Sequence, residues 1–347
     1  IIKLLYQITI KFSIFNLFLV EYIIDLYPAP CCIIMEVKLR SKIMFFKRMP
    51  KEISLYFYNC NNAGDILNQT LIYDLFGIPV KEERFISSDM IAIGSVLERI
   101  VSGSITGKRD KELQAEADKS KKITVWGTGL MYGYDDYSKM KFIRPVDICA
   151  VRGELTRNAC EKIMGKKVKC VTADPGLLAP YLLDRIPEKK YKIGIIPHFR
   201  EYEVEEYFEQ YKEISSKYDD CLIIDLSEEP TEVLKKIASC ETIMSTSLHG
   251  LIFADSLGVP SLWCEFTEKV IGNGYKFRDY YSSYGLTVNP FDLRSEELPT
   301  VDYIKNNYKV QYSDIVKKQE QLIRCFPYQN KRTKALIKFI RHGGPVK

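Results

Sequence analysis

The sequence is poor in histidine and lacks the common motifs for binding nucleotides and metals. Only three histidines occur among its 347 residues. It contains no GxGxxG fingerprint and no Walker A motif, so the usual dinucleotide and ATP loops are not indicated. No cysteine pair has CxxC spacing, and no group of Cys, His and Asp residues has the spacing of a metal site. A GxSxG elbow and a DxD-like motif at a strand end are also missing. We therefore predict neither a bound metal nor a cofactor.

The excess of charge is small as well. The chain carries 50 basic and 45 acidic residues, a net charge of +5, which is compatible with an anionic small substrate, an anionic membrane surface and many other functions. No dense run of Lys and Arg with interleaved aromatic residues is present, so a nucleic-acid partner is not predicted. The ten cysteines are scattered, and those in apolar runs, such as Cys221 and Cys264, are typical of small buried side chains. This use of cysteine favours a reducing, cytosolic compartment.

The N-terminal segment is apolar but has no uncharged run long enough for a membrane span. Charged residues interrupt residues 1–34, and the uncharged run 12–20 is too short to cross a bilayer. A signal peptide stays open, although no clear small-residue cleavage site is present. The chain begins with Ile rather than Met. Our hypothesis is that residues 1–34 lie upstream of the natural start, with Met35 or Met44 as the initiator.

From residue 51 onwards, strand-like and helix-like segments alternate. Such alternation predicts parallel sheets built from βαβ units. A polar, Pro-containing stretch at 182–192 has the composition of an inter-domain linker. The sequence therefore predicts an α/β protein with two Rossmann-like domains and a cleft between them. The predicted parts are the extension 1–50, an N-terminal domain 51–187, a C-terminal domain 188–300, and a helical segment 301–347 that returns to the first domain.

The predicted strands and helices can be given by residue number. The predicted strands are 53–58, 90–95, 122–129, 147–153, 168–176, 192–198, 221–227, 242–247 and 260–266, and the main predicted helices follow the first, fourth, sixth, seventh and eighth of these strands. In such sheets, ligands bind beyond the carboxyl ends of the strands. The candidate residues for a site all follow predicted strands.

His249 is the first candidate for a functional residue. It follows a predicted strand that ends in Ser245, Thr246 and Ser247, and it stands before Gly250 at the start of a predicted helix. A helix N-terminus favours anions, and a histidine there can hold or protonate an anionic reactant. The alternative is a helix cap with a partly buried histidine.

Arg152, in the stretch AVRGELT, is the second candidate. A strand delivers this arginine to the turn before a helix, and guanidinium groups suit bidentate binding of carboxylate or phosphate. A structural ion pair is an equally favoured alternative. Further candidates for a cleft lie in three other strand-to-helix turns and in the stretch KFRDYYSSYGL, where aromatic and charged residues could line a sugar or anion site or form a solvated helix. These are Asn61, Gly64, Asp65, Gly127, Gly129, His198, Lys276 and Asp279.

Several of these stretches, taken in order, resemble the polysaccharide pyruvyl transferase family. They are NNAGDILN (61–68), VWGTGLMYG (125–133), AVRGELT (150–156), TADPGLL (172–178), IGIIPH (193–198) and STSLHGLIFADSLGVPSL (245–262). The resemblance covers about residues 53 to 290, and the last stretch is its strongest part. Members of this family are similar in shape to GT-B glycosyltransferases, which have two Rossmann-like domains.

The resemblance implies a reaction and roles for residues. Members transfer the pyruvyl group of phosphoenolpyruvate to a sugar, usually as a ketal across two hydroxyls, with release of phosphate. The position of His249 implies the general acid, and that of Arg152 implies a grip on phosphoenolpyruvate. The expected setting is exopolysaccharide or capsule biosynthesis, with a saccharide acceptor that is lipid-linked or free, in the cytoplasm or in peripheral contact with the inner face of the membrane.

One position departs from the family pattern. Many members carry Arg two residues before the histidine, where this chain has Ser247. Hydroxyls of Ser245 and Ser247 with helix N–H groups could replace it, or a cation such as Lys276 or Arg278. Two rival functions stay open: a glycosyltransferase that uses nucleotide sugars, and a non-catalytic member of a polysaccharide assembly pathway. The sequence does not indicate the acceptor sugar.

Overall fold

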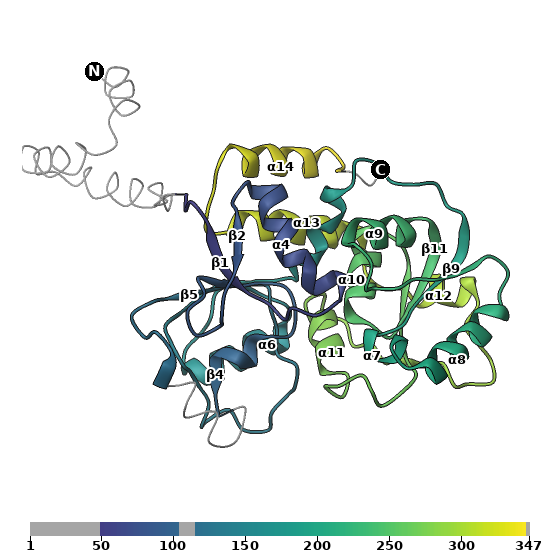
Figure 1. Ribbon diagram of the computed structural model, residues 1–347, viewed down its shortest axis with the longest axis horizontal. Coiled ribbons are helices and arrows are strands. Elements are labelled where there is room, and N and C mark those ends of the chain that lie inside the picture. Colours follow the sequence, from purple (N-terminus) through teal and green to yellow (C-terminus); the bar gives the residue numbers. More distant parts are fainter. Residues whose placement is uncertain (1–48, 104–114, 345–347) are drawn as a thin grey trace, which may run out of the picture. The chain divides into compact units, whose positions relative to one another are not determined.

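The computed structural model describes residues 49–103 and 115–344 (Figure 1). The predicted N-terminal extension, with both candidate initiators, lies outside these residues except for its last two. Within the described residues, no helix is both long enough and apolar enough to span a membrane. Their eight cysteines are free thiols; Cys264 is buried and Cys221 half-buried. Residues 48–347 form one compact unit by their contacts.

Six parallel strands form the first sheet. They are β1 (Ile53–Tyr56), β2 (Val80–Glu82), β3 (Met90–Ile91), β5 (Ile123–Trp126), β7 (Val146–Val151) and β8 (Val171–Thr172), in the order β2-β1-β3-β5-β7-β8. β2 is a strand that the sequence analysis did not predict. Several predicted strands are shorter in the structure because the glycine-containing turns that follow them are irregular. A small antiparallel pair, β4 (Val101–Ser102) with β6 (Lys141–Phe142), lies outside this sheet.

The second sheet has five parallel strands. They are β9 (Tyr191–Ile196), β10 (Cys221–Ile223), β11 (Cys240–Ser245), β12 (Ser261–Glu265) and β13 (Phe291–Asp292), in the order β10-β9-β11-β12-β13. The predicted α/β class with parallel sheets is therefore confirmed. Pro197, which follows β9, has a trans peptide bond, since no described peptide bond is cis.

Both sheets have the same strand order. Counted within its own sheet, each reads 2-1-3-4-5, and the first sheet adds a sixth strand at its far edge. The chain reverses its direction of travel across the sheet between the first and third strands. In doubly wound sheets, ligands bind beyond the carboxyl ends of the strands at this switch point. The switch points are therefore at β1 and β3 in the first sheet and at β9 and β11 in the second.

Side chains of successive strand residues alternate between separate cores. Trp126 and Ala150 face the largest core, whereas their neighbours Val125 and Val151 face a second core with α6 (Glu154–Met164). This alternation follows from the two-residue period of a strand. In the second sheet, Ile243 faces the largest core and the next residue faces a third, which contains residues of α8 (Glu205–Ser216) and α12 (Val301–Asn307).

The largest core joins the two sheets. It contains residues of α4 (Ala63–Phe76), η2 (Pro175–Leu182), α9 (Pro230–Ala238), α10 (Leu248–Ser256) and the C-terminal helices α13 (Tyr312–Cys325) and α14 (Lys331–Arg341). Figure 1 shows α4 between the first sheet and α9 with α10. The C-terminal helices hold the first sheet: Trp126 Nε1 donates to the carbonyl of Leu322 at 3.1 Å, and Phe326 stacks on Phe76 with ring centroids 3.8 Å apart.

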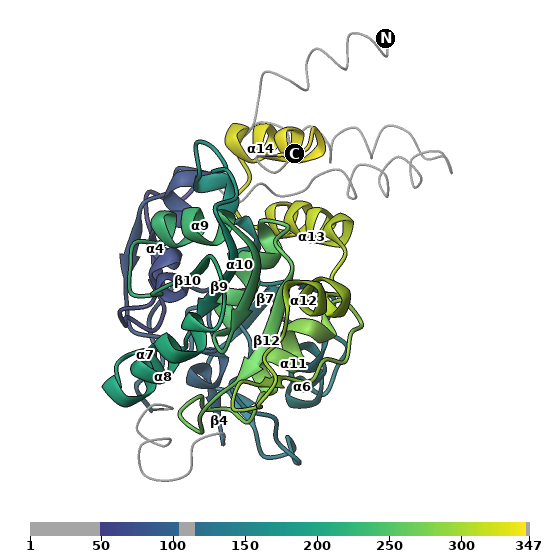
Figure 2. The same cartoon turned by 90° about the vertical axis from the view of Figure 1, so that its right-hand side faces the viewer.

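Helix α11 (Tyr275–Ser282) is a second link between the halves. It packs on α6, and the two helices lie side by side in Figures 1 and 2. Tyr280 and Tyr281 are buried, and the hydroxyl of Tyr280 donates to Asp255 Oδ2 at 2.7 Å. These two tyrosines belong to the core, so they line no sugar site and face no solvent. The sequence pattern missed this because α11 is inserted between two layers and is buried on more than one side.

Candidate functional site

The two switch points meet at a glycine and a histidine. Gly64 lies in the first turn of α4, after β1, and His249 lies in the first turn of α10, after β11. A Cβ atom on Gly64 would lie 1.9 Å from Nδ1 of His249, so the imidazole packs directly on the glycine backbone. Gly64 and His249, two predicted candidates that lie far apart in the sequence, are therefore neighbours. Gly64 is required for close approach of a protein side chain.

Helix α10 begins without a side-chain cap. Ser247 is its N-cap residue, and its hydroxyl makes no capping hydrogen bond. Ser245 is occupied elsewhere, since its Oγ bonds the backbone of Ile196 and Ser247 at about 3 Å. Gly250 permits this packing, because a Cβ there would lie 2.4 Å from Ser245 Oγ. The first N–H groups of α10 and the Ser247 hydroxyl are thus available to an anion, whereas Ser245 is a structural residue in this state.

His249 is buried and incompletely satisfied. It is 9% exposed, and its Nε2 has no hydrogen-bond partner among the described residues. Burial, followed by the charges of Lys276 and Arg152, lowers the pKa of His249 from 6.5 to about 3. The imidazole is therefore neutral at pH 7 in the free protein. A bound anion would offset both effects and raise this pKa.

Lys276 brings a buried cation to the same place. Its side chain is 6% exposed, and its Nζ lies 3.3 Å from Nε2 of His198. No carboxylate lies within ion-pair distance of Lys276 among residues 49–103 and 115–344. Burial and the charge of Arg152 lower the pKa of Lys276 from 10.5 to about 8. A buried ammonium without a carboxylate partner is costly, and an anionic ligand would remove that cost.

His198 contacts two other groups of the site. Its Nδ1 accepts from the backbone N–H of Arg200 at 3.3 Å, and its Nε2 lies 3.3 Å from Nζ of Lys276. Burial and the charge of Lys276 lower the pKa of His198 to about 2, so a second proton is excluded. The guanidinium of Arg200 lies over the Phe199 ring at 5.7 Å. No carboxylate among the described residues forms an ion pair with Arg200. Arg200 is therefore an additional cation beside His198, and the sequence analysis did not select it.

Arg152 has a different environment from the one its predicted role needs. It is fully buried; its Nε donates to Asp279 Oδ2 at 2.9 Å, its Nη1 to Ser95 Oγ at 2.5 Å, and its Nη2 to the carbonyl of Leu130. Of the two interpretations of Arg152, the ion pair is thus present in this state. Its charge still acts on the site, since it lowers the pKa of both Lys276 and His249.

Asp279 ties α11 to α6. Its carboxylate accepts from the N–H and the hydroxyl of Thr156 at 2.8 and 2.7 Å, besides Arg152. Ser282 accepts from the backbone N–H of Glu154 at 2.9 Å. The N-terminus of α6 is therefore capped from within the protein and is closed to a ligand. Asp279 is a structural partner here and does not face open space.

The remaining predicted residues are two glycines that follow β5 and two polar residues at the start of α4. Gly127 and Gly129 leave no room for a side chain. A Cβ atom on Gly127 would lie 2.1 Å from Pro175, and one on Gly129 would lie 2.5 Å from the Arg152 guanidinium. Asn61 is exposed at the start of the turn, and Asn62, not Asp65, is the residue that caps α4. Asp65 lies close enough to Lys276 for their charges to interact. Arg278 is not part of the cluster around His249 and Lys276, and its Nη2 donates to the carbonyl of Asn273.

Glu201 is a site residue that sequence reasoning missed. It is fully buried, and its carboxylate accepts from the hydroxyls of Tyr211, Thr246 and Thr267 at 2.8, 2.5 and 2.7 Å. It also pairs with His198 in the capping box of the short helix α7 (Phe199–Tyr202). The signal was present in the sequence, because Glu follows three residues after a residue that ends a strand. Glu201 fixes the turn that carries His198.

Two carboxyl groups near these cations are held partly protonated by burial. Burial raises the pKa of Asp65 from 3.8 to about 7 and that of Asp174 from 3.8 to about 6. Asp174 Oδ1 accepts from the N–H of Gly176 at 2.8 Å, whereas its Oδ2 is buried without a partner. No group of three or more His, Cys, Asp or Glu side chains with metal-site geometry occurs in the described part of the chain. The arrangement combines cations, neutral imidazoles and proton-carrying carboxyls.

A comparison with known protein families identifies the family of this chain. Residues 12–266 match the model of the polysaccharide pyruvyl transferase family, which covers most of the chain. The chain belongs to that family. The resemblance of the six sequence stretches is thereby confirmed.

Two relatives add detail. The chain is 34% identical to an uncharacterized protein of Acanthamoeba polyphaga mimivirus over 178 residues, 49% of this chain and 58% of the relative. It is 28% identical to the succinoglycan biosynthesis protein ExoV of Rhizobium meliloti (strain 1021) over 235 residues, 66% of this chain and 63% of the relative. The matched part is thus less than two thirds of the length of either relative.

Proposed function

We propose that this protein transfers the pyruvyl group of phosphoenolpyruvate to a sugar of a cell-surface polysaccharide or of its lipid-linked precursor, forming a pyruvate ketal and releasing phosphate. The observation that carries this proposal is the convergence of His249, Lys276, His198 and Arg200 on the uncapped N-terminus of α10. Family membership supports it. The proposal includes a GT-B-like arrangement in which the substrates bind between the two sheets, in the cytoplasm or at the inner face of the membrane.

The donor carries two anionic groups, and the site offers matching cations. Lys276 lacks a carboxylate partner, and the first N–H groups of α10 have none from a capping side chain. We assign one anionic group of phosphoenolpyruvate to Lys276 and the start of α10, beside the Ser247 hydroxyl. Arg200 extends the positive charge on the side of His198. Lys276 would thus replace the arginine that many members carry at the position of Ser247.

The reaction needs a proton donor, which we assign to His249. The bound donor raises the pKa of His249, and the imidazolium then protonates the methylene carbon of phosphoenolpyruvate. A sugar hydroxyl attacks the resulting cationic carbon and loses its proton. The C–O bond to phosphate then breaks, phosphate leaves with its electron pair, and a second hydroxyl attacks the same carbon and loses its proton. One positioned acid typically contributes a factor of about 10²–10⁴ to the rate. No bound cofactor or metal enters this scheme.

Thermal unfolding with ligands tests the proposal. A donor present at about 100 times its dissociation constant should stabilise the folded protein by about 2.7 kcal/mol, a shift on the order of 5 °C. We expect phosphoenolpyruvate to give this shift in the wild type and in the control Lys334→Met, an exposed lysine of α14, but not in Lys276→Met.

The other outcomes are equally informative. A shift with UDP- or GDP-sugars and none with phosphoenolpyruvate would indicate a glycosyltransferase. No shift with any donor, together with no phosphate release in the presence of glycan acceptors, would indicate a non-catalytic protein. Arg152→Ala is a poor probe here, because removing a buried partner of Asp279 unfolds or loosens the structure whatever Arg152 binds.

A further inference from the structure

A pocket of about 470 Å³ is bordered by loop 132–137, by α6 and by residues 272–278. Its size falls in the range of about 300–1,000 Å³ that is usual for small-molecule sites. It shares no residue with the cluster of His249, Lys276, His198 and Arg200. The sequence analysis selected only Arg278 among its lining residues, and for a different role.

Tyrosines provide the apolar part of the pocket lining. Tyr132, Tyr134, Tyr137 and Tyr275 all contribute. Tyr132 is 43% exposed, so its ring is accessible to a ligand. Tyr134 and Tyr137 meet edge to face with centroids 5.9 Å apart, and the Tyr137 hydroxyl accepts from the backbone N–H of Tyr134 at 3.2 Å. The rings are therefore held in place by one another.

Polar side chains also line the pocket. Asn158 and Lys162 lie four residues apart on α6, hence on one face, and both are exposed. Neither side chain makes a hydrogen bond or an ion pair with another described residue; Lys162 only lies over the Tyr137 ring at 5.2 Å. Arg278 and Asn273 face the pocket from the other side. Amide, ammonium and guanidinium groups on opposite walls suit a ligand with many hydroxyls.

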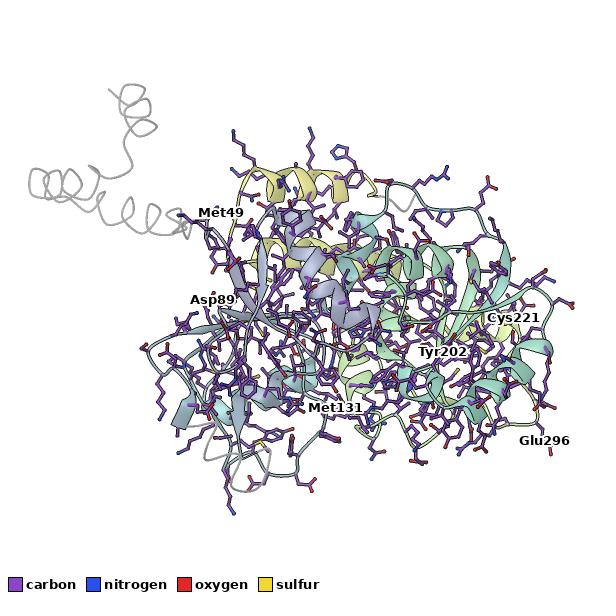
Figure 3. All side chains as sticks on the ribbon, viewed as in Figure 1. Met49, Asp89, Met131, Tyr202, Cys221 and Glu296 are labelled. Atoms are coloured by element: carbon purple, nitrogen blue, oxygen red, sulfur yellow. The ribbon has the colours of Figure 1, made fainter. Side chains whose placement is uncertain are left out.

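The wall opposite α6 has a constrained backbone. Gly272, Asn273 and Gly274 have φ values of 101°, 44° and 68°, and Asn273 adopts the left-handed region although it is not glycine. A Cβ on Gly272 would lie 2.7 Å from the carbonyl of Met131, which is labelled in Figure 3 close to α11. Such backbone is enriched at ligand-binding sites, where the surrounding structure holds it. The contact with Met131 fixes the pocket's mouth.

The pocket is connected to the proposed donor site through α11. Tyr275 and Arg278 line the pocket, while Lys276 and Asp279, the next residue after each, are buried on the adjacent side of the helix. The loop that carries Tyr132 is the second connection. Glu98 Oε1 accepts from the N–H groups of Met131 and Tyr132, and the carbonyl of the preceding residue, Leu130, accepts from Arg152. The pocket and the proposed donor site therefore share α11 and the loop at residues 130–132.

We propose that this pocket binds the pyranose ring of the acceptor saccharide. The tyrosine rings pack against the C–H face of the sugar, and Asn158, Lys162 and Arg278 bond its hydroxyls. The lining carries two cations, Lys162 and Arg278, and one carboxylate, Asp135, and this net positive charge favours neutral or acidic saccharides over basic ones. This inference rests on the proposed function only for the role of the saccharide as acceptor; binding of a saccharide can be tested without any reaction.

Saturation-transfer NMR with the full chain tests the pocket. The probes are the methyl glycosides of galactose, mannose, glucose and N-acetylglucosamine. We expect saturation transfer to the ring protons of at least one glycoside. Tyr132→Ala should raise its dissociation constant about fivefold or more, because an aromatic contact is lost. The matched control is Tyr303→Ala, a tyrosine of α12 that is likewise 43% exposed and lies outside the pocket. It should leave binding unchanged, and Asn158→Ala should weaken it.

The outcomes separate this inference from the proposed function. No saturation transfer to any of the four glycosides, or equal binding by Tyr132→Ala and Tyr303→Ala, overturns the pocket whatever the donor experiment shows. Glycoside binding that depends on Tyr132, in a protein that phosphoenolpyruvate does not stabilise, supports the pocket and rejects the pyruvyl transfer. Circular dichroism of each variant checks the fold, and both substituted side chains of the pocket are exposed.

Discussion

At the scale of single residues, the feature that decides the chemistry is a neutral histidine among cations. His249 has no partner for Nε2 and is surrounded by the charges of Lys276 and Arg152. The helix N-terminus to which it belongs also disfavours a proton. Its protonation in the folded protein therefore depends on a bound anion. In the proposed reaction, the residues assigned to the donor would in this way also hold the donor whose charge raises the pKa of His249.

The depressed pKa of His249 makes a prediction about stability and pH. The unfolded chain binds a proton at this residue below about pH 6.5, whereas the folded protein does not until about pH 3. The wild type should therefore lose stability as pH falls through 6.5, by up to about 1.4 kcal/mol per pH unit from this group. His249→Gln lacks the effect. Urea denaturation should show the wild type losing about 2 kcal/mol relative to the variant between pH 7 and pH 5. If the difference in the free energy of unfolding between wild type and variant stays constant from pH 7 to pH 5, the His249 ring is not desolvated in the folded protein.

The contact between Gly64 and His249 makes a second prediction. Gly→Ala inside a helix usually stabilises by up to about 1 kcal/mol. Here Gly64→Ala should instead destabilise by about 1–3 kcal/mol, since the new Cβ overlaps the imidazole. In a His249→Ala background the same change should be neutral or stabilising. Denaturant unfolding of the two single variants and the double variant measures this coupling. Equal effects of Gly64→Ala in both backgrounds would contradict the contact.

At the scale of elements, α11 decides how the two sheets are joined. It inserts Asp279 and Ser282 at the N-terminus of α6, and Lys276 beside His198. One short helix thus holds an ion pair, a helix cap and a cation of the site. The sequence of α11 mixes aromatic and charged residues and has no clear polar face. The reason is that different sides of this helix contact different parts of the protein.

The ion pair between α11 and the turn after β7 makes a third prediction. Asp279→Ala leaves Arg152 charged and buried, which should cost about 3–5 kcal/mol of the free energy of unfolding. Arg152→Ala should cost a similar amount, and the double variant less than the sum. The exposed pair Arg294–Asp292, with N···O at 2.7 Å, is the control: Asp292→Ala should cost less than about 1 kcal/mol. Additive losses in the double variant would show that the two groups do not depend on each other.

At the scale of the whole molecule, the C-terminal helices complete the first sheet. α13 packs on β7 and β8, α14 packs on α4 and α13, and Phe326 contacts both Phe76 and Trp126. Residues more than 200 positions apart in sequence therefore share one core. The described part of the chain should unfold as a unit because this core continues into the second sheet.

The buried ring of Phe326 makes the fourth prediction. Phe326 is 1% exposed, so Phe326→Ala should cost about 3–5 kcal/mol through lost burial and the cavity that remains. Phe339, in α14, is 48% exposed, and Phe339→Ala should cost less than about 1 kcal/mol. Chemical denaturation followed by fluorescence of the two tryptophans, one in each sheet, measures both. A transition of Trp126 that separates from that of Trp263 would contradict a shared core.

The sequence by itself determined the α/β class, most elements of both sheets and the family. It did so because strand periodicity, helix caps and strand-end motifs are local. His249 and Gly64 were selected from local patterns, and so was His198. Only the tertiary structure decided that His249 rests on Gly64, that Arg152 is paired with Asp279, and that Lys276 lies unpaired beside His198. These relations join residues far apart in sequence. Burial then shifts the pKa of each group, and burial depends on packing from every side. No single stretch of sequence contains that information.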